Sequence, residues 1–277
     1  MLELTRLEKA LDLFMARGSR GKLAFYRKER LARAYRPKFM RETRGFFDIY
    51  IKEVRDALVE PWKTADDIIK RVDWERMELT LGMLFKPLML EALGKMGTEF
   101  ERTFRKFDLI NDRAVKFAQT RSSKLITNIT EPTRESIRWA VKTGLKEGRS
   151  IGTISRHIRP LIGLNAPQAE AFEAYRLKLE AEGLGELEAW GKLSRYANHE
   201  LIYRAETIAR TETAASLAQG QCEAFRQNDI GEADWVSDPE ACGDCLAMVA
   251  DNPYKVADIE GLIPAHPRCE CTWVARE

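Results

Sequence analysis

Five side chains near the C-terminal end have the types and the spacing of a metal site. They form two short motifs, Cys242-x-x-Cys245 and His266-x-x-Cys269-x-Cys271. The whole chain of 277 residues has only 5 Cys and 3 His, so most of its sulfur ligands lie in one stretch. Thiolate and imidazole are the usual ligands of structural zinc, and a Cys-x-x-Cys turn directs two thiolates at one ion. The motifs therefore predict a structural zinc site.

The two motifs offer five ligands, whereas zinc takes four in a tetrahedral arrangement. Cys242 and Cys245 form the first half of the predicted site, and Cys269 is joined by either His266 or Cys271. If residue 270 lies in a regular strand, the two thiols beside it face opposite sides of that strand, which favours the histidine. If the chain turns there, both thiols can bind. The spacing leaves both alternatives open.

Catalysis at this cluster is the less favoured hypothesis. A zinc deaminase needs His-x-Glu, and neither His157 nor His199 has a Glu two residues later. The His-Glu-x-x-His motif of metalloproteases is absent from the sequence. His266 could act as a base for a nucleophilic Cys269, but a ligand cluster explains the neighbouring thiols more simply. We therefore expect a protein that is not an enzyme. Packed thiols, or a disulfide under oxidising conditions, are the alternatives to a metal.

The segment that carries the motifs is expected to need a stabilising ion. ADWVS and TWVAR are short, alternating and rich in Trp and Val, which predicts two strands. Between them lie many Pro, Gly and Asn residues that favour turns. A segment of about 45 residues with two short strands buries little apolar surface. Small modules of this kind are often stabilised by a metal.

The remainder of the chain is predicted to be helical. Apolar residues recur three and four positions apart in residues 2–15, 46–59 and 74–96. A helix capped by Thr130 with Pro132 in its first turn should end at Gly148, and another should begin at Asn165 and end at Gly183. Residues 150–163 predict a shorter helix, and residues 203–228 a long one. Three prolines are expected to end or kink helices, namely Pro37, Pro61 and Pro87.

These elements predict a mainly α (α+β) protein with three regions. Residues 1–109 form a helical N-terminal region with a basic stretch, and residues 110–200 form a helical middle region. Residues 201–277 contain the long helix and the small Cys/His β module. In the long helix, Glu206 and Arg210 are spaced for an i,i+4 ion pair. Its alanines should allow another backbone to pack closely, and Cys222 is expected to be a core or surface thiol.

Charge is distributed unevenly, although the formal net charge is only +2. Residues 17–44 contain eleven Lys or Arg and two Glu, whereas residues 229–277 contain eleven Asp or Glu and three Lys or Arg. The basic stretch suits an anionic partner such as nucleic acid or an acidic protein surface. A solvated helix face is the alternative. The candidate residues of this surface are Arg27, Lys28, Arg30, Arg33, Arg36, Lys38, Arg41 and Arg44.

The sequence contains no run of about 18 apolar residues such as a membrane helix needs. The first residues include acidic side chains and lack the pattern of a cleaved signal peptide. We therefore expect a protein made in a cytoplasm, where thiols stay reduced.

Several segments in order resemble a known family. YRAETIARTETAASLAQGQCEAF is followed by Trp235, Asp238, CGDC, Gly261 and PAHPRCEC. This order is similar to that of the phage Mu F-like head morphogenesis family, the minor head proteins of tailed bacteriophages. The resemblance covers about residues 110–275. It implies a virion component that is made in the host cytoplasm, lies in the capsid interior or at the portal vertex, and acts in capsid assembly and DNA packaging or ejection.

The resemblance also implies partners and motif residues. The expected partners are the portal protein and capsid or scaffold proteins, with double-stranded DNA as a further candidate, and no membrane. An alternative within this frame is a DNA-binding packaging accessory. The family pattern falls on the ligand motifs and on Arg210, Thr211, Glu212, Trp235, Asp238 and Pro267. Members more often have Arg where Glu270 stands. We expect Arg210 to pair with Asp238 or with the thiolate-rich site.

Overall fold

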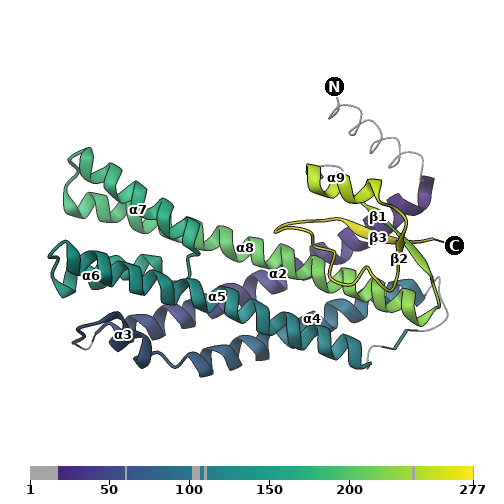
Figure 1. Cartoon of the computed structure of the whole chain (residues 1–277), viewed down its shortest axis with the longest axis horizontal. Helices are drawn as coiled ribbons and strands as arrows, with labels where there is room; N and C mark the ends of the chain where they lie inside the picture. Colours follow the sequence, from purple (N-terminus) through teal and green to yellow (C-terminus); the bar gives the residue numbers. More distant parts are fainter. Residues whose placement is uncertain (1–17, 60, 102–106, 109–110, 239–240, 277) are drawn as a thin grey trace. The chain divides into compact units, whose positions relative to one another are not determined.

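The computed structural model describes residues 18–59, 61–101, 107–108, 111–238 and 241–276. The structure is 74% helical and has a small three-stranded antiparallel sheet near its C-terminal end (Figure 1). The predicted mainly α class with a small β module is therefore confirmed. The helix predicted in residues 2–15 lies outside the described residues.

The helices and strands follow one another along the chain with short connections. The helices are α2 (Gly18–Ala57), α3 (Ala65–Arg71), α4 (Trp74–Glu101), α5 (Asp112–Lys146), α6 (Ile151–Ile158), the 3-10 turn η1 (Arg159–Leu161), α7 (Ala166–Ala181), α8 (Glu186–Gln227) and α9 (Gly243–Ala250). The strands are β1 (Glu232–Val236), β2 (Tyr254–Lys255) and β3 (Thr272–Arg276). Among the described residues, no helix is both long and apolar enough to cross a membrane.

The chain divides into two compact units, each built from segments that are distant in the sequence. Unit 1 contains the described residues of 1–41, 85–120 and 206–277, and unit 2 contains residues 42–84 and 121–205. The long helices α2, α4, α5 and α8 each contribute residues to both units. The three sequential regions predicted above stay a prediction.

Unit 1 combines the sheet with parts of the long helices. Strand β1 lies between β2 and β3 and pairs antiparallel with both. Trp235 on β1 is opposite Trp273 on β3, and their buried rings meet edge to face with centroids 5.2 Å apart. Elsewhere in the unit, α8 passes so close to α4 that a Cβ on Gly220 would lie 2.4 Å from the carbonyl oxygen of Leu93. The sequence predicted that another backbone would pack closely against the alanines of α8, and the close approach is found at Gly220.

Unit 2 has a core of aromatic side chains from several helices. Tyr50 of α2 is fully buried and packs against Trp74, the first residue of α4, with ring centroids 5.9 Å apart. Trp62, in the connection after α2, is buried and donates its Nε1–H to Ser155 Oγ of α6 over 3.3 Å. The indole thus satisfies its polar group while it fills the core.

Prolines are accommodated inside three helices, and the helix start predicted at Thr130 is wrong. Pro37 lies within α2 and Pro87 within α4. Helix α5 begins at Asp112 and runs through Thr130 and Pro132, so Thr130 is a buried interior residue and no cap. A proline removes one helical hydrogen bond, and the long buried faces on both sides of it compensate for that loss.

Other predicted boundaries are confirmed. The side chain of Asn165 caps α7 by accepting a hydrogen bond from the backbone N–H of Gln168. Gly148 and Gly183 follow α5 and α7 with φ of 68° and 70°, the left-handed conformation that ends many helices. The long helix α8 covers the predicted span and begins earlier, at Glu186. Helix α9 was not expected, since turns were predicted there.

Candidate metal centre

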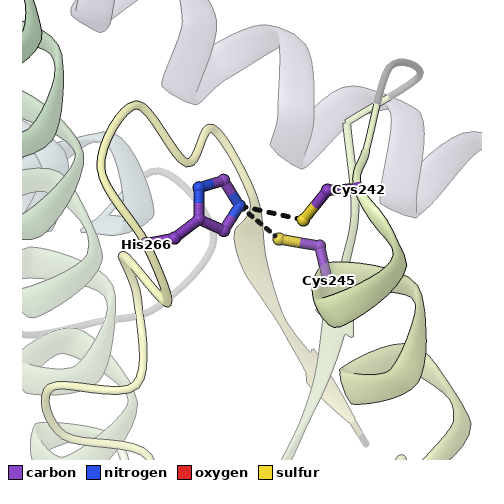
Figure 2. A group of neighbouring side chains, drawn as sticks. All are labelled: Cys242, Cys245 and His266. Atoms are coloured by element: carbon purple, nitrogen blue, oxygen red, sulfur yellow. Dashed lines mark hydrogen bonds between the residues drawn. The ribbon is translucent and has the colours of Figure 1, made fainter.

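The five predicted ligand residues come together in unit 1. Cys242 is the N-cap of α9 and Cys245 lies in its first turn. His266, Cys269 and Cys271 belong to the loop between β2 and β3. Figure 2 shows the imidazole of His266 pointing toward both thiols at the start of α9. The cluster therefore joins a short helix to a long loop.

Several donor atoms of the cluster lie close to one another. His266 Nε2 lies 3.2 Å from Cys242 Sγ and 3.1 Å from Cys245 Sγ, and Cys245 Sγ lies 3.8 Å from Cys269 Sγ. Zinc–sulfur bonds of about 2.3 Å in a tetrahedron place two sulfurs about 3.8 Å apart. The site could therefore hold a metal ion without a large rearrangement of these side chains.

Two groups of three ligands meet at Cys245. One group is Cys242, Cys245 and His266, and the other is Cys245, Cys269 and Cys271; within each group the ligand atoms lie within 4.8 Å of one another. Strand β3 begins only at Thr272, so residue 270 is outside regular β structure. The predicted alternative of a regular strand is therefore not observed, and the thiols of Cys269 and Cys271 lie within 4.8 Å of each other. Both thiols consequently approach the same partner.

The loop geometry brings the second motif back on itself. Arg268, between the histidine and the next ligand, has φ of 66°, and the N–H of Cys269 donates to the carbonyl of His266 over 3.1 Å. A positive φ at a residue other than glycine is uncommon and marks a tight turn here. This turn folds the segment from His266 to Cys269 back on itself, so that both residues lie beside Cys245.

Local hydrogen bonds prepare two of the ligands for metal binding. The backbone N–H of Cys245 at the start of α9 stabilises the thiolate of Cys242 and lowers the pKa of that thiol. His266 Nδ1 lies 2.8 Å from the carbonyl oxygen of Pro267. Since a carbonyl only accepts, Nδ1 donates, and this bond raises the pKa of His266. The lone pair of the neutral ring is then on Nε2, the atom that faces the thiols.

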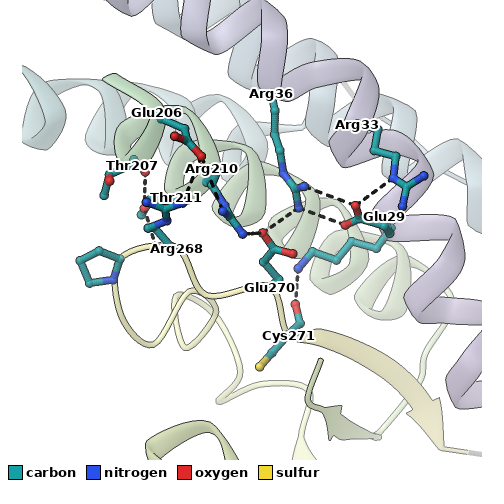
Figure 3. A network of polar contacts seen from close by, with 12 residues as sticks. Glu29, Arg33, Arg36, Glu206, Thr207, Arg210, Thr211, Arg268, Glu270 and Cys271 are labelled. Carbon is teal, nitrogen blue, oxygen red and sulfur yellow. Dashed lines mark hydrogen bonds and ion pairs between the residues drawn. The ribbon is translucent and has the colours of Figure 1, made fainter. Parts of the chain in front are cut away.

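A layer of charged residues holds the loop from outside. Glu270 receives ion pairs from Arg210 of α8 and, at 3.1 Å, from Arg36 of α2; Arg36 also pairs with Glu29 at 3.0 Å (Figure 3). The carboxylate between the last two cysteines is thus matched by two guanidinium groups. These two guanidinium groups come from α2 and α8, which are remote from Glu270 in the sequence.

A buried lysine contacts the cluster loop directly. Lys28 of α2 is 2% exposed, and its Nζ donates to the carbonyl oxygen of Cys271. Burial lowers the pKa of Lys28, although the nearby thiols of Cys271 and Cys269 and the carboxylate of Glu270 oppose that shift. The lysine is placed to offset the negative charge of a thiolate-rich site.

The motif residues of the long helix also contact this loop. The N–H of Arg268 donates to Thr211 Oγ1 over 3.0 Å, and its guanidinium pairs with Glu206 at 3.0 Å. The predicted pair of Glu206 and Arg210 is present at 3.7 Å. Arg210 was expected to pair with Asp238 or with the thiolate-rich site, and its guanidinium pairs with Glu270, which lies between two cysteines of that site.

The other motif residues have structural positions. Trp235 is fully buried in the sheet, and Glu212 is buried within α8. Asp238 is half-buried just after β1, and its backbone interacts with the Cys271 thiol. Pro267 contributes only its carbonyl to the cluster. Cys222 is 1% exposed in α8, and burial raises the pKa of its thiol to about 12, as a packed thiol requires.

The predicted anionic-partner surface is only partly a surface. Lys28 is buried, so its assignment to that surface is wrong. Arg36 is half-buried and pairs with Glu270 and Glu29. Three more members are in ion pairs on exposed parts of unit 1: Arg30 with Glu99, Arg33 with Glu29 and Lys38 with Glu91. Arg27 is half-buried, and Arg41 and Arg44 are exposed on α2. For these exposed members, binding of an anionic partner stays a prediction.

One sequence signal could have identified the buried lysine. Ala24, Lys28 and Ala32 are four residues apart and all buried, and Tyr35 and Phe39 continue the same face. A lysine within such a stripe faces the core rather than solvent.

Comparison of the chain with protein-family models, with curated proteins and with solved structures found no match.

Proposed function

We propose that the Cys/His cluster binds one structural zinc ion. The observation that carries this proposal is that Cys245 Sγ lies 3.1 Å from His266 Nε2 and 3.8 Å from Cys269 Sγ, while Cys242 Sγ lies 3.2 Å from the same nitrogen. The donors are of the type that zinc prefers. His266 also donates its Nδ1–H to the carbonyl oxygen of Pro267, a bond that is typical of metal-bound histidines. The ion would join α9 to the loop that leads into β3.

The zinc proposal has a direct test. The purified chain is analysed for metal by mass spectrometry, and its melting temperature and protease sensitivity are compared before and after strong chelation. We expect one zinc per chain, with cleavage between residues 243 and 271 once the metal is removed, because ligand binding and folding of such modules are linked. A metal-free chain whose melting is unaffected by chelator would show that the thiols are packed or oxidised instead.

We propose further that the chain is a minor head protein of a tailed phage or prophage. This proposal rests on the resemblance over residues 110–275 to the Mu F-like family. The placement of Arg210 and Thr211 against the ligand loop supports it, because residues that recur together in a motif would then serve one module. In this role the chain acts without catalysis, meets the portal and capsid or scaffold proteins, and resides in the virion.

The head-protein proposal is tested on particles. Phage or prophage particles that encode this chain are purified by density, and their proteins are identified by mass spectrometry. We expect the intact chain in a few copies per particle, and cross-linking is expected to join it to the portal protein. Full-length chain found only in the unassembled fraction would contradict the proposal.

A contact with double-stranded DNA is a second candidate, favoured by the exposed Arg41 and Arg44 on α2. Binding through phosphates would weaken steeply as salt rises. A double substitution of these two arginines by glutamine should then reduce the salt dependence of DNA binding by the full chain. Binding that is absent at low salt would remove this candidate and leave the protein partners.

A further inference from the structure

A cleft in unit 2 gathers polar groups that lack a partner within the protein. Its volume is about 360 Å³, which is within the range of small-molecule sites. Arg55, in the last turn of α2, and Arg159, the first residue of η1, bring two guanidinium groups to it. Ser194 and Asn198 line the same cleft from α8, where a spacing of four residues places them on one face.

The polar groups of this cleft are free to bind a ligand. Within the part of the chain that the structure describes, neither Arg55 nor Arg159 has a side-chain ion pair or hydrogen bond, and the same holds for the side chains of Ser194 and Asn198. No carboxylate is among the described residues that line the cleft. The cleft therefore offers an excess of hydrogen-bond donors and uncompensated positive charge.

A second pocket in unit 2 provides a contrast. It has a volume of about 520 Å³ and shares Trp190 with the first. Its arginines are already neutralised: Arg156 pairs with Glu186 at 2.7 Å, and Arg176 pairs with Glu180. An anion would have to displace these carboxylates there, whereas it would meet no such competition in the smaller cleft.

Helix dipoles explain part of the arrangement. Arg55 and Arg159 both lie at the C-terminal ends of helices, α2 and α6, where a positive charge is favourable. The dipole does not account for the hydroxyl and the amide that line the same cleft. The remaining lining is apolar and includes Ile162, Leu201 and the half-buried Trp190. The cleft thus has a cationic part and a part that suits a planar ring.

We propose that this cleft binds a phosphate monoester that carries a planar ring, of the size of a nucleoside monophosphate. The guanidinium groups of Arg55 and Arg159 hold the phosphate through paired N–H donors, and Trp190 contacts the ring. The same chemistry is presented by the terminal nucleotide of a 5′-phosphorylated strand. This inference is independent of the metal site and of a role in the phage head.

The test is calorimetric titration of the full chain at low salt with three probes: adenosine monophosphate, inorganic phosphate and 5′-phosphorylated hexathymidylate. We expect one adenosine monophosphate per chain and about tenfold weaker binding of inorganic phosphate, because the ring contact is missing. Tighter binding of the oligonucleotide would support the cleft and identify a strand end as the source of the phosphate. No heat with any probe at millimolar concentration would overturn the inference.

Matched variants locate the binding. Arg55→Gln and Arg159→Gln should each weaken adenosine monophosphate binding about tenfold, with only small falls in melting temperature, because both side chains are exposed and lose only their interaction with a helix dipole. Arg195→Gln is the control, since this exposed arginine adjoins Ser194 on α8 but does not line the cleft. Equal weakening by the control would overturn the inference. Should an arginine variant fail to fold, Trp190→Leu is expected to weaken adenosine monophosphate more than inorganic phosphate.

Discussion

Lys28 and Cys271 are 243 positions apart in the chain, yet the buried ammonium of the lysine donates a hydrogen bond to the cysteine carbonyl. This contact brings helix α2 to the loop that carries three of the five candidate ligands. Arg36, two turns further along α2, approaches the same loop through Glu270 at 3.1 Å. Two positive charges from one helix therefore support a site whose ligands are mainly thiols.

Replacing the buried lysine should weaken metal binding. Lys28→Met keeps most of the side-chain volume but removes the charge that faces the thiolates, so we expect about tenfold lower zinc affinity. Competition with a chromophoric chelator measures it. Lys52→Met is the matched control, because Lys52 is exposed on the same helix. An affinity that is the same in both variants would show that the lysine only fills space.

Glu270 should connect the loop to both helices. Glu270→Gln removes the charge that faces Arg210 and Arg36, and a loss of about 1–3 kcal/mol in the free energy of unfolding is expected from its charged hydrogen bonds. Glu270→Arg should cost more, since it adds a third guanidinium. Glu170→Arg, at an exposed position of α7, serves as the control and should change stability by less than about 0.5 kcal/mol. Chemical denaturation measures all three.

The cysteine variants should differ in a defined order. Cys245 belongs to both groups of three ligands, so Cys245→Ser is expected to abolish stoichiometric zinc binding. His266→Ala and Cys271→Ser distinguish the two choices for the fourth ligand: the variant that retains one zinc identifies the residue that is dispensable. Cys222→Ser is the control, because this thiol is buried in α8 outside both groups. Full zinc content in the Cys245 variant would contradict a site centred on that residue.

The ligand cluster could be predicted from sequence because its information is local. A Cys-x-x-Cys turn and a His-x-x-Cys-x-Cys segment define donors by spacing alone, and alternating Trp and Val residues define the strands beside them. The choice between His266 and Cys271 could not be made, since it depends on whether residue 270 lies in a strand or a turn. That conformation is fixed by Glu270 binding to α2 and α8, which are remote in sequence.

The roles of Lys28 and Arg36 beside the cluster were also missed because their partners are remote in the sequence. Lys28 and Arg36 lie in a strongly basic stretch, and composition alone favours a surface for an anionic partner. The buried face of α2 instead directs them to unit 1, where their partners come from the other end of the chain. The helix start predicted at Thr130 failed because Pro132 lies inside α5, and Pro37 and Pro87 also lie inside helices whose buried faces continue past them.

The close approach of α8 to α4 gives a prediction that opposes helix propensity. Alanine is a better helix former than glycine by about 1 kcal/mol, but a Cβ on Gly220 would lie 2.4 Å from the Leu93 carbonyl oxygen, a backbone atom that cannot move aside. We expect Gly220→Ala to lower the free energy of unfolding by about 1–3 kcal/mol. At Gly191 in the same helix, the nearest atom is the flexible Arg195 guanidinium at 3.8 Å, so Gly191→Ala should raise stability by up to about 1 kcal/mol. Thermal and urea unfolding of both variants would decide the point, and equal stabilisation by the two alanines would mean that the helices do not approach this closely.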